Sequence, residues 1–418
     1  ARRGRLDRIA RCGRTPGGGD EAISLDAPRH CCGQAGVVSS DRSVPELLRR
    51  LVSFPTISSR SNLELVDWVS ERFSGGDASI KRIPSVDGTK ANLVVSLGPG
   101  TAGGLMLSGH TDVVPVEGQD WASDPFELIE ADGRLFGRGT ADMKGFIAVA
   151  MSEMLRLERR RLRRPLSLLL SYDEEVGCLG APSMIEEIAR TGPPPAMVIV
   201  GEPTSMRVAD CHKGFSLCRT RVIGSAAHSS LVRDNVSAVV VAGELVARLS
   251  EMARGACGSG TADHFTSIST NLIRGGTAPN ILAAECEFYW DLRATPGDSA
   301  AGYIRGFEAA IREVVAGYLA AGRPCDVVNT VLADVPALIA GVGDAAERTR
   351  RLLDDARSPV AVPFATEAGL FQRAGWTTCV CGPGDIEQAH RPDEYVRVDQ
   401  LLRCQDFLGR VIDEVCCA

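Results

Sequence analysis

Histidine is scarce in this sequence, which has six among 418 residues. The positions are His30, His110, His212, His228, His264 and His390. Any site built on imidazole nitrogen must draw on this short set. The scarcity therefore narrows the search for functional residues.

Long apolar runs are also absent. No segment reaches the roughly 18 consecutive apolar residues that a membrane-spanning helix needs. Residues 1–40 lack the apolar stretch of about 7–15 residues found in a secretory signal. We therefore expect no membrane partner and no secretion by that route.

The 14 cysteines form no CxxC pair, and a chain of this length can fold without a disulfide framework. We expect reduced thiols in a cytoplasmic protein.

The net charge is −7 although the first 14 residues contain six arginines, so the rest of the chain is acidic. That balance argues against nucleic acid as a partner.

Helical and extended patterns alternate through the first half of the chain. Apolar residues recur at the helical spacing over Val44–Leu51 and Leu63–Phe73, and again over residues 141–157. Ala91–Leu97 and Leu105–Ser108 have the composition of strands. This alternation predicts an α/β fold whose sheet is mostly parallel and covered by helices.

The order changes after Gly214 to the β-α-β-β-α-β order of a ferredoxin-like unit. Its expected elements are strands Phe215–Val222, Thr266–Arg274, Ile281–Leu292 and Cys325–Val331, and helices Val236–Met252 and Ala300–Leu319. We therefore predict a disordered leader at 1–40, a catalytic domain in two pieces, 41–214 and 332–418, and an inserted α+β domain at 215–331. We call residues 215–331 the insert.

Polar residues follow four predicted strands of the catalytic domain. The pairs are Leu105–Ser108 with His110 and Asp112, Leu166–Tyr172 with Glu174 and Glu175, Met197–Val200 with Glu202, and Thr377–Cys381 with His390. Because parallel strands end at one edge of a sheet, we expect these side chains to converge. A glycine-rich turn over Gly137–Asp142 adds the carboxylate of Asp142.

Taken singly, these motifs are weak. The pair Glu174-Glu175 alone would suit a solvated helix start, and Gly137-x-Gly139 alone would suggest a dinucleotide loop. Asp142 occupies the place of that loop's third glycine, which argues against a nucleotide site. Several carboxylates at one buried sheet edge repel each other unless cations neutralise them, so their joint placement favours a metal site.

Histidine nitrogens and carboxylate oxygens are suitable ligands for Zn²⁺ and its divalent neighbours. The candidate ligands are His110, Asp142, Glu175, Glu202 and His390. If Asp142 bridges two metals, each metal has three protein ligands and an open position for water. We expect the nearby thiols of Cys379 and Cys381 to pack in the sheet rather than bind metal.

Two further acidic residues have candidate catalytic roles beside the metals. Asp112 lies on the same side of an extended chain as His110 and could accept its second imidazole N–H, which would fix the tautomer. Glu174 remains as the general base that faces the attacking water.

At these residues the sequence resembles a known family. The motifs are Ser108–Pro115, Gly137–Gly145, Ser171–Gly177 and Gly201–Thr204. They are similar to the dinuclear zinc metallopeptidase family that includes acetylornithine deacetylase, succinyl-diaminopimelate desuccinylase, aminoacylase and glutamate carboxypeptidase, and the resemblance runs from about Val44 to the C-terminus. Three further segments, His212–Gly214, Thr366–Phe371 and Gly382–His390, resemble acetylornithine deacetylases in particular.

The resemblance implies a ligand set for two divalent metals, zinc or cobalt. His110 and Glu202 complete one site, Glu175 and His390 complete the other, and Asp142 bridges them together with a water. It further implies a cis peptide bond after Asp142.

The resemblance also assigns roles outside the metal cluster. Glu174 becomes the base that activates water and passes the proton to the leaving amine. The insert becomes a lid through which the protein forms a homodimer, and His228 reaches the partner's site to stabilise the oxyanion. Asn280 and Arg293 help to bind the substrate carboxylate. On the residues alone, His228 could instead be a helix-start residue and Arg293 a salt-bridge partner within the insert.

The expected reaction is deacetylation of N2-acetyl-L-ornithine to L-ornithine and acetate in arginine biosynthesis. An alternative is another N-acyl amino acid or peptide hydrolase of the family, since the same ligands serve all of them. A different class is a metal-binding protein without activity. Retention of Glu174 argues against that class, because a purely structural metal site needs no spare base.

Overall fold

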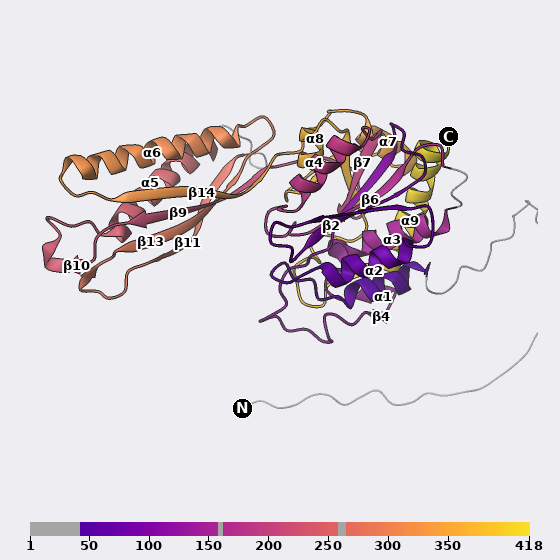
Figure 1. The fold of residues 1–418 in the computed structure, drawn as a ribbon, viewed down its shortest axis with the longest axis horizontal. Coiled ribbons are helices and arrows are strands. Elements are labelled where there is room, and N and C mark those ends of the chain that lie inside the picture. The colour runs from indigo at the N-terminus through magenta and orange to yellow at the C-terminus, as the bar shows by residue number, and fades with distance from the viewer. Residues whose placement is uncertain (1–41, 158–161, 258–264) are drawn as a thin grey trace, which may run out of the picture. The chain divides into compact units, whose positions relative to one another are not determined.

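An eight-stranded sheet occupies the centre of the catalytic part of the computed structural model, which describes residues 42–157, 162–257 and 265–418 (Figure 1). In sheet order the strands are β1 (Ser79–Pro84), β2 (Ala91–Leu97), β6 (Leu166–Ser171), β3 (Leu105–His110), β7 (Met197–Pro203), β16 (Thr378–Gly382), β8 (Ala209–His212) and β15 (Val360–Val362). The four middle strands, β6 to β16 in this order, are parallel. The predicted α/β fold is thus confirmed, and the predicted leader, with His30, lies outside the described residues, as does His264.

Helices cover both faces of this sheet. They are α1 (Val44–Val52), α2 (Leu63–Phe73), α3 (Gly145–Arg156), α4 (Ala181–Thr191), α7 (Ala345–Leu352), α8 (Ala368–Arg373) and α9 (Val398–Ile412). Leu47, Phe146 and Phe407 belong to one buried core on the side of α1, α3 and α9. Met184 and Phe371 belong to a second core on the side of α4 and α8. Because both faces are covered, β3, β6 and β7 are buried along their whole length.

The insert contains a separate antiparallel sheet of four strands in the order β11-β13-β9-β14. Its elements are β9 (Phe215–Ile223), β10 (Ala227–His228), α5 (Ala238–Cys257), β11 (Ser267–Gly275), β12 (Ile281–Leu282), β13 (Glu285–Arg293), α6 (Ala300–Ala320) and β14 (Asp326–Val335). The last strand, β14, continues past residue 331, where the insert was predicted to end. Alternate residues of β13 are buried, and Trp290 packs against Phe307 of α6 with ring centroids 5.1 Å apart. The two helices α5 and α6 lie along one face of this sheet (Figure 1).

Four details differ from the sequence prediction. The single strand expected over Ile281–Leu292 is two strands, β12 and β13, because Ile281 and Leu282 pair with β10 instead. The helix expected over residues 141–157 begins with an irregular turn, Thr140–Lys144, in which Asp142 and Met143 have non-helical backbone angles. Glu202 lies within β7 rather than after it. The short strands β4 (Ile129–Ala131), β5 (Arg134–Phe136) and β17 (Tyr395–Arg397), which form a small third sheet, were not predicted.

The thiols behave as expected where the structure describes them. Cys379 and Cys381 are buried in β16. Within the described ranges, no helix combines the length and apolar character needed to span a bilayer.

Candidate active site

The ends of the four parallel strands bring the candidate ligands together. His110 is the last residue of β3 and pairs with Ser171, the last residue of β6. Glu174 and Glu175 follow Ser171 in the loop after β6. β7 carries Glu202 close to its end, and the chain after β16 leads to His390. The sheet edge therefore gathers side chains that lie far apart in the sequence, as the strand pattern predicts.

Asp142 stands between the two histidines. Its Oδ1 is 2.9 Å from Nε2 of His110, and its Oδ2 is 3.4 Å from Nε2 of His390. Glu202 Oε1 lies 3.9 Å from Nε2 of His110, and Glu175 Oε2 lies 3.0 Å from Nε2 of His390. Each oxygen of Asp142 thus faces a different histidine–glutamate pair.

The donor set fits divalent cations. One ligand atom each from His110, Glu174 and Glu202 lies within 4.8 Å of the others, and the same holds for His110, Asp142 and Glu175. The side chain of His390 is 51% exposed, whereas those of His110 and Asp142 are almost fully buried. Buried carboxylates crowded around imidazole nitrogens need positive charge for balance, which a pair of bound cations would provide.

The pKa values report the same crowding. Burial raises the pKa of Glu175 to about 7, with the charge of Asp142 adding to the shift. Burial also raises the pKa of Glu174 and of Glu202 well above the ordinary glutamate value. Hydrogen bonds to Asp142 and Glu175 raise the pKa of His390 to about 10. The cluster therefore holds protons where cations would bind, and cation binding would displace them.

Asp112 contacts His110 differently from the prediction. His110 Nδ1 lies 2.9 Å from the backbone carbonyl oxygen of Asp112 and 3.6 Å from its carboxylate. At these distances the imidazole N–H donates to the carbonyl. The carboxylate accepts instead from Ser58 Oγ at 2.7 Å and from the backbone N–H groups of Glu174 and Glu175 at 3.1 and 3.3 Å. The expectation that the Asp112 carboxylate fixes the tautomer is thus corrected, and this carboxylate instead holds the turn that carries the two glutamates.

Glu174 lies beside the ligands. Its side chain accepts a hydrogen bond from the Cys178 thiol at 3.3 Å, and burial raises the pKa of that thiol, so the sulfur stays protonated.

The peptide bond between Asp142 and Met143 is cis, as the resemblance implies.

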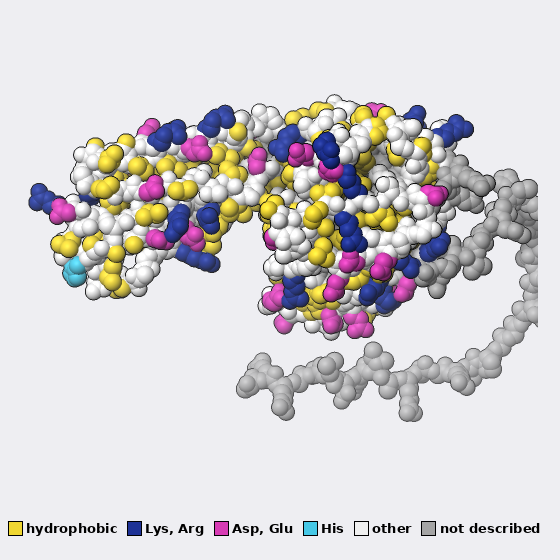
Figure 2. Space-filling view, in the orientation of Figure 1, with side chains coloured by type: hydrophobic (Ala, Val, Ile, Leu, Met, Phe, Trp, Pro, Cys, Tyr) yellow, Lys and Arg dark blue, Asp and Glu magenta, His cyan; other side chains and the backbone are white. Residues whose placement is uncertain are grey.

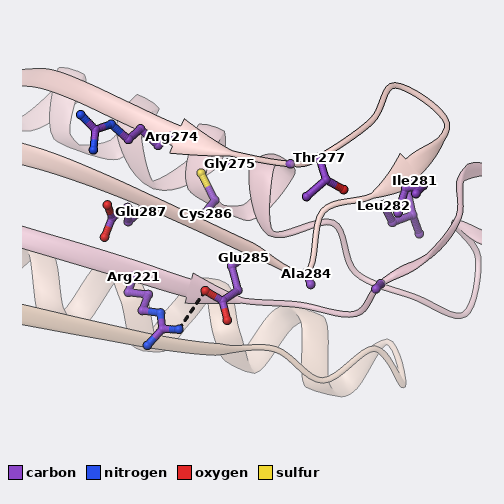
Figure 3. Close-up of a pocket in the computed structure, with 12 residues that line it drawn as sticks. Arg221, Arg274, Gly275, Thr277, Ile281, Leu282, Ala284, Glu285, Cys286 and Glu287 are labelled. Carbon is purple, nitrogen blue, oxygen red and sulfur yellow. Dashed lines mark hydrogen bonds and ion pairs between the residues drawn. The ribbon is translucent and has the colours of Figure 1, made fainter.

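Two cavities need to be distinguished. A cavity of about 200 Å³ is lined by the acidic cluster and by residues at the base of the insert, including Phe215 and Arg293. A larger cavity of about 550 Å³ lies in the insert, between the ends of its strands and β12, and its lining includes the Arg221–Glu285 ion pair (Figure 3). The smaller cavity is the candidate active site, because of these two cavities it alone is lined by a histidine and by the clustered carboxylates.

The residues predicted for the insert separate into two groups. Arg293 lines the smaller cavity, stacks on Phe215 with its guanidinium 4.1 Å from the ring centroid, and lies 3.5 Å from Asp291. His228 and Asn280 are exposed near β10 and β12 and do not line that cavity. His228 Nδ1 accepts from the backbone N–H of Ser230 at 3.3 Å and so caps a short helical turn.

Four buried charged residues near the site were not singled out by the sequence patterns: Arg138, Lys144, Glu367 and Glu394. Lys144 is fully buried, its Nζ donates to the Phe54 carbonyl at 2.8 Å, and burial lowers its pKa to about 7. The sequence signal that could have identified two of them is their closeness to predicted ligands. Lys144 follows Asp142 by two residues, and Glu394 follows His390 by four.

Comparisons with known proteins identify the family of this chain. The sequence pattern of peptidase family M20/M25/M40 matches residues 106–414. The acetylornithine deacetylase of Myxococcus xanthus is 34% identical over 382 residues, which cover 88% of this chain and 96% of that protein. The acetylornithine deacetylase of Proteus mirabilis is 32% identical over 400 residues, which cover 89% of this chain and 97% of that protein.

A solved structure shows the same fold. The Bacillus subtilis YXEP protein, described as a dinuclear metal-binding peptidase of the M20 family, aligns with a TM-score of 0.61 at 13% identity and covers 89% of this chain and 98% of its own. The family match spans most of the chain, and both relatives are matched over nearly their whole length. This chain therefore belongs to peptidase family M20/M25/M40 and is a hydrolase.

Proposed function

We propose that this protein is a metal-dependent amidohydrolase that converts N2-acetyl-L-ornithine and water to L-ornithine and acetate, as a step of arginine biosynthesis in the cytoplasm. The observation that carries the hydrolase proposal is the placement of Asp142 between two histidine–glutamate pairs. The substrate is inferred from relatives in two organisms that are named acetylornithine deacetylase. The free cysteines are compatible with a reducing compartment.

His110 and Glu202 would hold one divalent cation, Glu175 and His390 the other, and Asp142 both. Zinc and cobalt suit this set of imidazole and carboxylate donors. Bound there, the cations would supply Lewis acidity toward the amide carbonyl and make water more acidic.

Glu174 is the proposed general base. Its carboxylate lies within the donor cluster, and its backbone is held by Asp112. It would take a proton from the attacking water and deliver that proton to the α-nitrogen of ornithine as the amide C–N bond breaks.

Arg293 is the proposed partner of the substrate carboxylate. Its guanidinium lines the same cavity as Glu174 and Glu175 and stacks on the Phe215 ring, which fixes its orientation. A planar guanidinium can donate two parallel hydrogen bonds to one carboxylate. Asn280 of the partner subunit is proposed as a second contact to this group, because Asn280 does not line the cavity of its own chain.

The insert is proposed to form a homodimer and to act as a lid. Among the residues that the structure describes, more than half of the exposed large hydrophobic side chains belong to it, including Val239, Val240, Leu272 and Ile273. Figure 2 shows hydrophobic side chains spread over one face of the insert. Exposed apolar surface of this kind is typical of an interaction site. His228 of the partner subunit would then donate to the oxyanion that develops on the amide carbonyl.

Two measurements test the proposed function. The purified protein should hydrolyse N2-acetyl-L-ornithine faster than succinyl-diaminopimelate and a panel of other N-acyl amino acids, and a preference for another substrate would move the assignment within the family. A chelator should abolish the activity, and Zn²⁺ or Co²⁺ should restore it.

The Glu174→Gln variant separates binding from chemistry. It should bind about two metals per chain, as the wild type should, because the amide still occupies the carboxylate's place. Its kcat should fall by at least about 100-fold, the contribution expected of general base catalysis. Metal content by elemental analysis and steady-state kinetics provide the comparison, and near-normal turnover would contradict the assigned role.

A further inference from the structure

We infer that Glu394 is a positioning residue that holds the Asp142 turn and, through Arg138 and Gln119, ties that turn to the segment carrying His390. The inference rests on the proposed function in one respect, namely that Asp142 and His390 bind divalent cations. The positions of Asp142 and His390 then depend on the buried carboxylate of Glu394, which is not itself a ligand.

The Glu394 carboxylate receives four hydrogen bonds. Oε1 accepts from the backbone N–H groups of Ala141 at 2.9 Å and Asp142 at 3.1 Å. Oε2 accepts from the N–H of Gly139 at 2.9 Å and from Arg138 Nη1 at 2.7 Å. The N–H groups at the start of a helical turn lack backbone partners, and here one side chain from a distant segment satisfies three of them. Glu394 thus binds the backbone of the residue proposed to bridge both cations.

The small third sheet delivers Glu394 to this position. Tyr395 of β17 pairs with Phe136 of β5, and the N–H of Gly137 donates to the Glu394 carbonyl at 2.9 Å. Gly139 has φ 83°, the left-handed region that favours glycine. The turn Gly139–Asp142 therefore leaves β5 through a glycine that suits this conformation, and the Glu394 carboxylate supplies acceptors for the N–H groups of the turn.

The same network reaches His390. Arg138 Nη2 donates to Gln119 Oε1 at 2.6 Å, and Gln119 Nε2 donates to the carbonyl of His390 at 3.0 Å. Arg138 Nη1 also lies 3.3 Å from the carbonyl of Arg391. His390 has φ 64°, a left-handed conformation that a non-glycine residue keeps only when its surroundings hold it there. Because Asp142 and His390 come from segments far apart in the chain, this network sets the distance between them.

Charge balance explains why the position needs a carboxylate. The side chains of Arg138 and Glu394 are each 1% exposed, so neither charge is stabilised by water. A buried guanidinium without its partner is strongly unfavourable. Removing the Glu394 charge would leave positive charge next to a site that must accept cations, in addition to removing acceptors for the turn.

The test compares Glu394→Gln with the wild type for metal binding by the apo protein. Competition with a zinc-binding dye should show about a 10- to 100-fold loss of Zn²⁺ affinity, the range found when groups that orient metal ligands are removed. The absorption spectrum of the Co²⁺-loaded protein should change, because Asp142 is no longer held in place. Activity on the acetylated substrate should recover partly at excess metal, whereas that of Glu174→Gln should not.

Asp355→Asn is the matched control. Asp355 is also a buried carboxylate paired with arginine, since it accepts from Arg357 Nε at 2.7 Å and Nη2 at 2.8 Å, but neither group touches a proposed ligand. This control should lose stability without losing Zn²⁺ affinity. If Glu394→Gln behaves like the control, with a lower melting temperature and unchanged affinity, the positioning role is wrong.

Gln119→Ala keeps the inference testable if Glu394→Gln does not fold. Gln119 is partly exposed and its removal leaves the four bonds to Glu394 in place. Its loss should weaken mainly the cation held by His390, so the titration should resolve one tight and one weakened site. Two unchanged sites would overturn the proposed link to His390. If the wild type itself binds no divalent cation, the proposed function fails, and that result is distinct from either variant's outcome.

Discussion

Asp112 shows how a single residue can serve two parts of the site. Its carbonyl oxygen accepts from His110, while its carboxylate accepts from Ser58 and from the backbone of Glu174 and Glu175. One residue thereby orients a proposed metal ligand and the proposed base. Sequence spacing identified Asp112 as part of the site but could not assign its contacts, because an H-x-D spacing fixes which residues are near and not which oxygen is used.

His212, outside the proposed metal cluster, should make the stability of the protein depend on pH. Its ring lies between Thr366 Oγ1 at 3.1 Å and the Lys213 carbonyl at 2.8 Å, and burial lowers its pKa to about 4. The unfolded chain takes up a proton near pH 6.5, whereas the folded protein resists until about pH 4. His212 therefore contributes stability that is present above pH 6.5 and lost as the pH falls toward 4.

We predict that this residue alone removes about 3 kcal/mol of unfolding free energy between those pH values, at 1.36 kcal/mol per pKa unit. Urea unfolding of the metal-free wild type and of His212→Gln, measured across this range, isolates the contribution. The variant should be less stable at pH 7.5, and the difference between the two proteins should shrink as the pH falls. A constant difference would mean that His212 does not titrate in this window.

At the scale of elements, close packing of β7 against α3 sets the position of Glu202. A Cβ added to Gly201 would lie 2.0 Å from Cγ of Phe146, a fully buried ring with no room to move. We predict that Gly201→Ala destabilises the protein by about 1–3 kcal/mol through overpacking. It should also weaken Zn²⁺ binding, because the adjacent Glu202 shifts with the strand.

The control is Gly243→Ala in α5, where an added Cβ meets nothing within 4 Å. That change should stabilise the protein by about 0.5–1 kcal/mol, since alanine loses less backbone freedom than glycine in a helix. Urea unfolding measures both effects. Equal stability of the two variants would show that β7 and α3 can adjust without cost.

The elements that could be predicted are those with a regular apolar period. α2 and β2 have the predicted bounds Leu63–Phe73 and Ala91–Leu97, because one has an apolar helical face and the other is buried on both sides. Strands such as β5 and β17, at three residues each, are too short to show a period. The same limit hid Glu394, whose partners are backbone N–H groups that lie about 250 positions earlier and leave no pattern in the side chains. The proposed ligands could be found because each lies at or after the end of a strong strand or in a glycine-rich turn.

At the scale of the whole molecule, the proposed dimer predicts that a complete active site needs two chains. Glu174 lies in the acidic cavity, whereas His228 is exposed in the insert and does not line the cavity of its own chain. In a symmetric dimer whose inserts pack together, each site would combine Glu174 of one chain with His228 of the partner subunit.

Mixing two inactive variants tests this arrangement. Glu174→Gln and His228→Ala should each lose most activity as homodimers. After unfolding and refolding at equal concentrations, about half of the dimers would be mixed, and each mixed dimer would have one complete site and one site lacking both groups. The mixture should therefore recover about a quarter of the wild-type kcat, with Asp355→Asn mixed with Glu174→Gln as the reference for refolding losses. If both catalytic groups acted within one chain, no dimer in the mixture would contain an intact site, and activity would stay at the level of the separate variants. Sedimentation measurements on the wild type provide the accompanying check, because a monomer that is fully active leaves no role for a partner's His228.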